Sequence, residues 1–206
     1  LQAGISRTPL PAEVKAAHDS AASVRDSNED DKYLQPSAYY VVTIAEKVLD
    51  DQYRVFQETN GQQGIEKREE LKFTGEGDNR KPVKDVVPAQ VLDAIRARDE
   101  YNDRIAIDRD PQKNGLLYAF QSADLYFVYG DFENSKKRFQ PMYDQYCGVN
   151  EWGYKAWEKL ISMSNFEGDA AQSRKLAEGK SCAYDAETQK AEESIRKPVK
   201  QGVAYL

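Results

Sequence analysis

A short motif occurs twice in the second half of this 206-residue chain and limits what it can fold into. Gly130-Asp131 and Gly168-Asp169 are each followed by a serine five positions after the glycine. Each dipeptide joins two stretches in which apolar residues recur at the spacing of an amphipathic helix. The motif therefore predicts consecutive helix-turn-helix hairpins, an architecture that serves binding more often than catalysis.

The same spacing predicts helices through the rest of the chain, with Pro and Gly marking the breaks between them. The strongest pattern runs from Ser37 to Glu58. The predicted division of the chain is a lead-in with a short helix (1–36), a helical hairpin interrupted by an insertion at about 60–87 (37–109), two hairpins (110–183), and a polar capping helix with a tail (184–206).

The insertion has no helical periodicity. Gly75, Gly77 and Pro82 interrupt a mixture of basic and acidic residues, with a short extended piece expected at Leu71 to Phe73. These features predict a flexible surface arm, and a contact with a partner is the alternative.

Charge and hydropathy exclude two classes of partner. The net charge is −6, from 29 basic and 35 acidic residues, without a long basic run, so attraction to nucleic-acid phosphates should be weak. No stretch approaches the ~18 apolar residues that a membrane span needs. Because the chain begins at Leu1 without a methionine or a signal pattern, we expect a processed protein or an excised part of a longer one.

The two hairpins resemble the tetratricopeptide repeat family, whose unit of ~34 residues is a helix, a tight turn and an antiparallel helix. Gly130, Asp131, Ser135 and Phe139 match the turn and second helix, and Gly168, Asp169, Ser173 and Ala177 take the same places in the next unit, in which Trp157 and Leu160 match the first helix. The resemblance covers roughly residues 110–181. It implies an all-α fold, a right-handed superhelix of antiparallel helical hairpins.

In that family the first helices of successive hairpins line a concave groove that binds peptides or another protein. The resemblance implies a partner-binding groove with two phenylalanines as apolar anchors and polar residues that fix the register: Leu117, Phe120, Asp124, Phe127, Lys155, Glu158, Ser162 and Asn165. The alternative is that both phenylalanines belong to the core. Asp124 and Glu158 would repel an acidic tail, which disfavours a clamp for a C-terminal carboxylate.

Cys147 and Cys182 are 35 residues apart, about one repeat of ~34 residues. They could face each other across neighbouring hairpins as a disulfide, or be two unpaired thiols packed as small hydrophobes. A disulfide would indicate an oxidising compartment such as the periplasm. The residues after each hairpin also resemble repeat proteins of bacterial cell envelopes; a cytoplasmic location is the alternative.

Neither a catalytic nor a metal site is predicted, and no cofactor is expected. His18 is the only histidine and lacks a nucleophile pattern, so we expect it at the surface. The acidic run at 28–31 lacks the ligand spacing of a calcium loop and indicates a solvated turn.

These observations predict a non-catalytic protein-binding scaffold or adaptor in a bacterial envelope assembly. One alternative is a structural spacer within a longer helical solenoid. Another is a helical enzyme acting on glycans, which would need a carboxylate pair such as Asp124 and Glu158 within ~10 Å.

Overall fold

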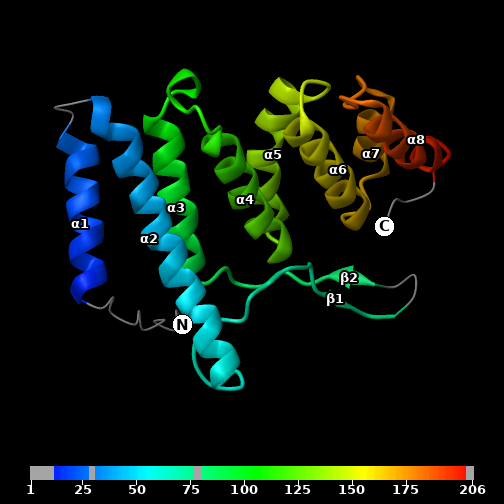
Figure 1. Ribbon diagram of the computed structural model, residues 1–206. Coiled ribbons are helices and arrows are strands. Elements are labelled where there is room, and N and C mark those ends of the chain that lie inside the picture. Colours follow the sequence, from blue (N-terminus) through cyan, green and yellow to red (C-terminus); the bar gives the residue numbers. More distant parts are fainter. Residues whose placement is uncertain (1–11, 28–30, 77–79, 203–206) are drawn as a thin grey trace. The chain divides into compact units, whose positions relative to one another are not determined.

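The structure is a computed structural model that describes residues 12–27, 31–76 and 80–202, with only the backbone of Asp31. This described part is mostly helical, which confirms the all-α class (Figure 1). Its elements are α1 (Ala12–Ser27), α2 (Asp31–Glu58), β1 (Phe73–Thr74), β2 (Lys81–Pro82), α3 (Ala89–Arg104), the 3₁₀ helix η2 (Ile107–Arg109), α4 (Asn114–Val128), α5 (Phe132–Tyr146), α6 (Glu151–Phe166), α7 (Ala170–Glu178) and α8 (Ala186–Lys200).

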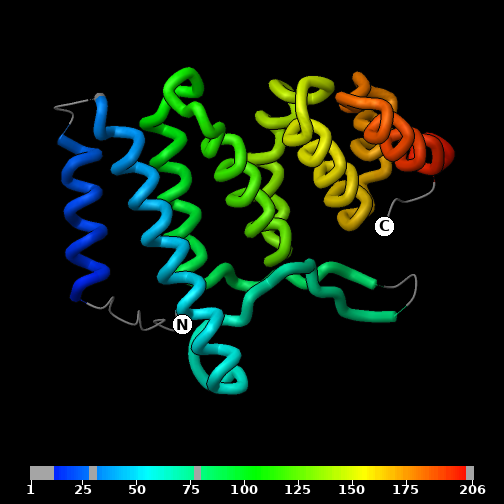
Figure 2. The backbone as a smooth tube through the Cα atoms, viewed as in Figure 1, coloured from blue at the N-terminus to red at the C-terminus, as the bar shows by residue number. Residues whose placement is uncertain are grey.

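The chain divides into two compact units. Unit 1 consists of residues 1–69 and 86–122, and unit 2 of residues 70–85 and 123–206. The course of the segment between α2 and α3 can be followed in Figure 2, and this segment contains both strands.

In unit 1 the long helix begins earlier than its sequence predicts. The expected start was Ser37, after Pro36, but α2 already begins at Asp31. A proline in the second turn of a helix removes one backbone hydrogen bond and does not prevent the preceding turn from forming. The last six residues of the predicted lead-in (1–36) therefore belong to α2. Residues 28–30 of the acidic run lie outside the described residues.

The core of unit 1 lies between α2 and α3, and α4 contributes Tyr118. The buried side chains of this core are Ala38, Val41, Val42, Ala97, Tyr101, Ile105 and Tyr118. Two buried arginines at its edge pair with partly exposed carboxylates: Arg98 Nη2 lies 2.9 Å from Glu46 Oε1, and Arg25 pairs with Glu100. Burial of these charges is tolerated because each has an opposite charge and a hydrogen bond.

The start of α4 depends on Asp110, in a different way from the one that the sequence predicts. Asp110 followed by Pro111 is a pattern typical of a helix cap and first turn, but α4 begins at Asn114. The buried Asp110 carboxylate accepts hydrogen bonds from the Gly115 N–H at 2.7 Å and from the Tyr101 hydroxyl at 3.1 Å. It thereby satisfies a donor of the first turn and attaches α4 to α3.

In unit 2 the two Gly-Asp motifs form nearly identical corners. Gly130 has φ +71° and Gly168 φ +73°, the left-handed conformation that glycine adopts without a steric cost. At each corner the aspartate N–H donates to a carbonyl five residues back, Tyr126 in the first and Ser164 in the second. This pattern is the Schellman motif that ends helices.

The aspartate of each corner also begins the next helix. The Asp131 carboxylate accepts from the Asn134 N–H and the Asp169 carboxylate from the Gln172 N–H, each three residues on. Because one residue serves the end of one helix and the start of the next, the two helices must reverse direction within a few residues. The corners thus account for the hairpins α4–α5 and α6–α7.

The described residues 70–76 and 80–85 of the insertion do not form a free arm, which corrects the sequence-based expectation. β1 and β2 pair antiparallel, Phe73 with Pro82 and Thr74 with Lys81, and the strands belong to unit 2. The Phe73 ring lies 5.2 Å from the ring of Phe166 at the end of α6. Long-range packing therefore orders a segment that carries no pattern of its own.

The C-terminal part of unit 2 is held by a covalent bond and a buried carboxylate. Cys147, after α5, and Cys182, before α8, form a disulfide with Cα atoms 4.3 Å apart. The Glu192 carboxylate, 3% exposed, accepts hydrogen bonds from the Ser181 hydroxyl and from the N–H groups of Cys182 and Ala183. The disulfide and the hydrogen bonds of Glu192 together fix the loop before α8.

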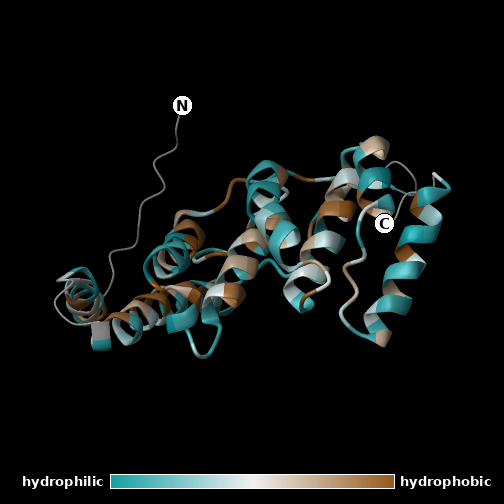
Figure 3. Ribbon diagram, turned by 90° about the horizontal axis from the view of Figure 1, so that it is seen from above, coloured by the Kyte–Doolittle hydropathy of each residue, from teal (hydrophilic) through white to brown (hydrophobic). Residues whose placement is uncertain are grey.

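Helix α8 is mainly hydrophilic, as Figure 3 shows, but one side of it is buried. Ile195 and Val199 are buried, and Arg196 lies with its guanidinium carbon 5.0 Å from the centroid of the buried Trp157 ring. Among the described helices none combines the length and apolarity required to cross a bilayer.

Candidate binding site

Helix α6 provides the side chains of the candidate site, and its start is closely fitted to the end of α5. The Asn150 side chain caps α6 by accepting from the N–H groups of Trp152 at 3.1 Å and Gly153 at 3.2 Å. A β-carbon at Gly153 would overlap the backbone of Tyr146, so only glycine permits this approach.

One side of α6 forms the core of unit 2, which fixes what the other side presents. Ala156, Trp157, Leu160, Ile161, Met163 and Ser164 are buried there. The Trp157 indole N–H donates to the Leu176 carbonyl at 3.1 Å, which ties α6 to α7. Rotation of the helix is therefore excluded.

Away from that core, Trp152, Lys155, Lys159 and Ser162 follow one another at spacings of three and four, and all four are partly accessible. We call these four residues the α6 stripe. Lys155 Nζ lies 4.8 Å from the centroid of the Trp152 ring and 2.7 Å from Glu151 Oε2. The stripe thus begins with a tryptophan ring that a lysine covers in part, and tryptophan is among the residues enriched at the centres of protein interfaces.

The next turn of the stripe connects α6 to α4. Lys159 Nζ lies 2.6 Å from Asp124 Oδ1 and 4.0 Å from the centroid of the Phe127 ring. All three side chains belong to unit 2. The ammonium group is thus held by a carboxylate and an aromatic face together.

The structure brings together some of the residues that the resemblance assigns to a groove. Asp124 and Phe127 meet through Lys159, which the sequence reasoning did not select. The Ser162 hydroxyl donates to the Glu158 carbonyl at 3.0 Å, and Asn165 Oδ1 accepts from the Ser173 hydroxyl at 2.8 Å. Leu117 and Phe120 are half-buried residues of α4 and belong to unit 1.

The role expected for Phe127 needs correction. This side chain is 8% exposed and its ring is stacked 5.7 Å from the ring of Phe132, with Phe166 close to both. It forms core between hairpins and is not available as an exposed anchor. Trp152 is a partly accessible aromatic residue of α6, and it could have been found from its place one turn before Lys155.

One carboxylate of this region already has an ionic partner. Asp124, one member of the carboxylate pair that a glycan-acting enzyme would need, is paired with Lys159. Among the described residues no group of three or more His, Cys, Asp or Glu could hold a metal ion. His18 lies on α1 with Nδ1 3.4 Å from Asp19 Oδ1 and a partly exposed side chain.

Unit 2 contains a buried carboxylate, Glu192. Burial alone would raise the pKa of this carboxyl, but hydrogen bonds from Ser181, Cys182, Arg196 and Ala183 stabilise the anion and hold its pKa below the ordinary value of 4.5. Its function is structural, since it fixes the loop that carries Cys182.

Comparisons of the chain with protein-family models, with curated proteins and with solved structures found no match.

Proposed function

We propose that this chain is a non-catalytic scaffold or adaptor of the tetratricopeptide kind, which binds a protein or peptide along the α6 stripe. The observation that carries the proposal is the stripe itself: an aromatic ring and two cations on successive turns of a helix that the Asn150 cap begins and the Gly168-Asp169 corner ends. In this proposal the hairpins follow one another as a right-handed superhelix, and binding needs no cofactor.

The side chains of the stripe define the partner. Trp152 offers a flat apolar contact, which suits an apolar side chain of the partner. Lys155 and Lys159 already pair with Glu151 and Asp124, so a partner carboxylate would have to share these cations. Because each lysine is already neutralised, the stripe favours a peptide that packs an apolar side chain on Trp152 and offers neutral hydrogen-bond acceptors to the two ammonium groups.

We also propose an oxidising location, the periplasm or the cell envelope of a bacterium. The disulfide between Cys147 and Cys182 supports it, because such bonds persist where thiols are not kept reduced.

The test is affinity purification of the tagged chain from its native cells, with partners identified by mass spectrometry. Trp152→Ala and Lys155→Glu should each reduce the recovery of the same protein at least about tenfold, as expected for central interface residues. Lys175→Glu on the exposed side of α7 is the matched charge control and should leave recovery unchanged. Equal recovery by all three variants, with unchanged melting temperatures, would refute the use of the stripe.

A further inference from the structure

The first Gly-Asp corner of unit 2 is an occupied docking site for an extended strand of this same chain. Val83, Lys84 and Asp85, which follow β2, pass over it. The Asp85 N–H donates to the Tyr129 carbonyl at 2.9 Å, and Lys84 Nζ lies 3.6 Å from Asp131 Oδ1. A β-carbon at Gly130 would overlap the Val83 carbonyl oxygen, so glycine is needed for this contact as well as for the turn.

The second corner has the same backbone but lacks that cover. Asp131 has φ −84° and ψ 71°, and Asp169 has φ −83° and ψ 75°. Nothing in the described part of the chain lies within 4 Å of a β-carbon built on Gly168. Asp131 is partly buried beneath Lys84, whereas Asp169 is exposed.

We propose that the Gly168-Asp169 corner binds an extended, lysine-bearing segment of a partner protein, in the way that the Gly130-Asp131 corner binds Val83 to Asp85. The glycine admits the partner's backbone, and the Asp169 carboxylate pairs with the partner's lysine. This second site lies outside the α6 stripe, so it does not depend on whether the stripe binds a partner.

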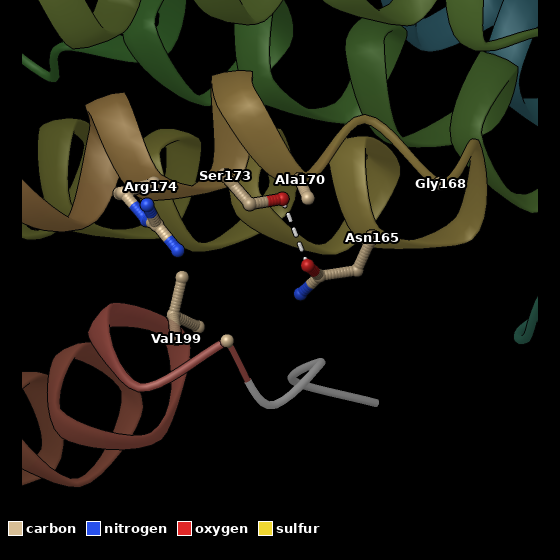
Figure 4. A pocket seen from close by; sticks show the side chains of 7 residues that line it. Asn165, Gly168, Ala170, Ser173, Arg174 and Val199 are labelled. Atoms are coloured by element: carbon tan, nitrogen blue, oxygen red, sulfur yellow. Dashed lines mark hydrogen bonds between the residues drawn. The ribbon is translucent and has the colours of Figure 1, made fainter.

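A small pocket beside the second corner supports this assignment. Its volume is about 100 Å³, and Figure 4 shows Asn165 and Arg174 pointing into it from α6 and α7, with Val199 of α8 facing them. The Ser173 hydroxyl donates a hydrogen bond to Asn165 Oδ1 and keeps the Asn165 side chain in place. The Arg174 guanidinium provides N–H donors for the carbonyl groups of an extended backbone.

The probe is a synthetic peptide with the sequence of residues 80–88, added to the full ¹⁵N-labelled chain in an NMR titration. We expect the amide signals of Gly168, Asp169 and Gln172 to shift in a saturable way, and a peptide with Lys84→Glu to bind more weakly. No shift at these amides at millimolar peptide would overturn the proposal. Shifts confined to Gly130 and Asp131 would also overturn it, because the peptide would then only displace the chain's own strand.

Two variants test the contacts without removing the corner. Asp169→Asn keeps a good helix cap but removes the charge, and should weaken peptide binding about threefold, as expected for an exposed ion pair. Gly168→Asn places a side chain in the open position with a residue that tolerates positive φ, and should weaken binding at least about tenfold.

The matched controls are Asp131→Asn, at the covered corner, and Trp152→Ala, in the α6 stripe. Both should leave the shifts at Gly168 unchanged. If neither variant at the second corner alters the affinity, the site is not where we place it. If the Trp152→Ala variant lost the peptide-induced shifts, the peptide would bind at the stripe, which would also overturn the proposal.

Discussion

The backbone of Val83 crosses Gly130 so closely that a β-carbon on the glycine would overlap the Val83 carbonyl oxygen. At Gly168, in a corner of the same geometry, nothing described occupies that place. Substitution of these two glycines therefore separates two costs that usually occur together. One is the strain of a side chain at positive φ, and the other is the steric overlap of its β-carbon with a neighbouring segment.

Gly168→Ala should lower the free energy of unfolding by about 1 kcal/mol, the cost of placing a β-carbon at positive φ. Gly130→Ala should cost about 1–3 kcal/mol more, because it also displaces Val83. Urea unfolding followed by tryptophan fluorescence measures both, since Trp152 and Trp157 both lie in unit 2. Equal losses would mean that the strand does not dock on the first corner.

The disulfide should stabilise unit 2 by about 3–4 kcal/mol, the chain-entropy value for a loop of this length. The double variant Cys147→Ser with Cys182→Ser should therefore shift the urea midpoint downward. Thiol titration under denaturing conditions should find no free thiol without reductant and two after reduction. Two free thiols in protein isolated from its native compartment would contradict both the bond and the oxidising location.

Glu192 should make the stability of unit 2 depend on pH. Its pKa is lower in the folded chain than in the unfolded one, so its contribution is fully present above the ordinary value of 4.5 and is lost as the pH falls through the folded value. Glu192→Gln should destabilise unit 2 by about 2–4 kcal/mol at pH 7, since the carboxylate binds Ser181 and Arg196 among its donors.

Urea unfolding between pH 7 and pH 3 checks this expectation. The difference between the wild type and Glu192→Gln should shrink as the pH falls below 4.5, whereas Asp185→Asn, in an exposed helix cap, should show a much smaller effect. If the difference in unfolding free energy between the two proteins did not change with pH, the charge of Glu192 would not be the source of its stabilising effect.

Local patterns predicted those parts of the fold that local physics determines. The two corners follow from Gly and Asp at fixed places, and the helix between Phe132 and Tyr146 follows from apolar spacing. The start of α2 was missed because Pro36 indicates a boundary, although a proline near a helix start can be accommodated.

Contacts between distant residues were beyond such reasoning. The order of the insertion depends on Phe73 meeting Phe166 and on Asp85 meeting Tyr129, and no pattern within 60–87 encodes either contact. The same holds for Lys159 and Asp124, which are far apart in sequence. Burial of Glu192 was hidden for a different reason: on a polar helix, its pairing with Arg196 resembles an ordinary surface pair.

The central claim is that the α6 stripe contacts a partner protein, and site-specific photo-crosslinking in native cells tests it most directly. A photoreactive amino acid at position 155, in the stripe, should form a covalent adduct with one other protein, while the same group at the exposed position 137 on α5 should form none. The absence of any adduct at 155, or the same adducts at both positions, would contradict the account.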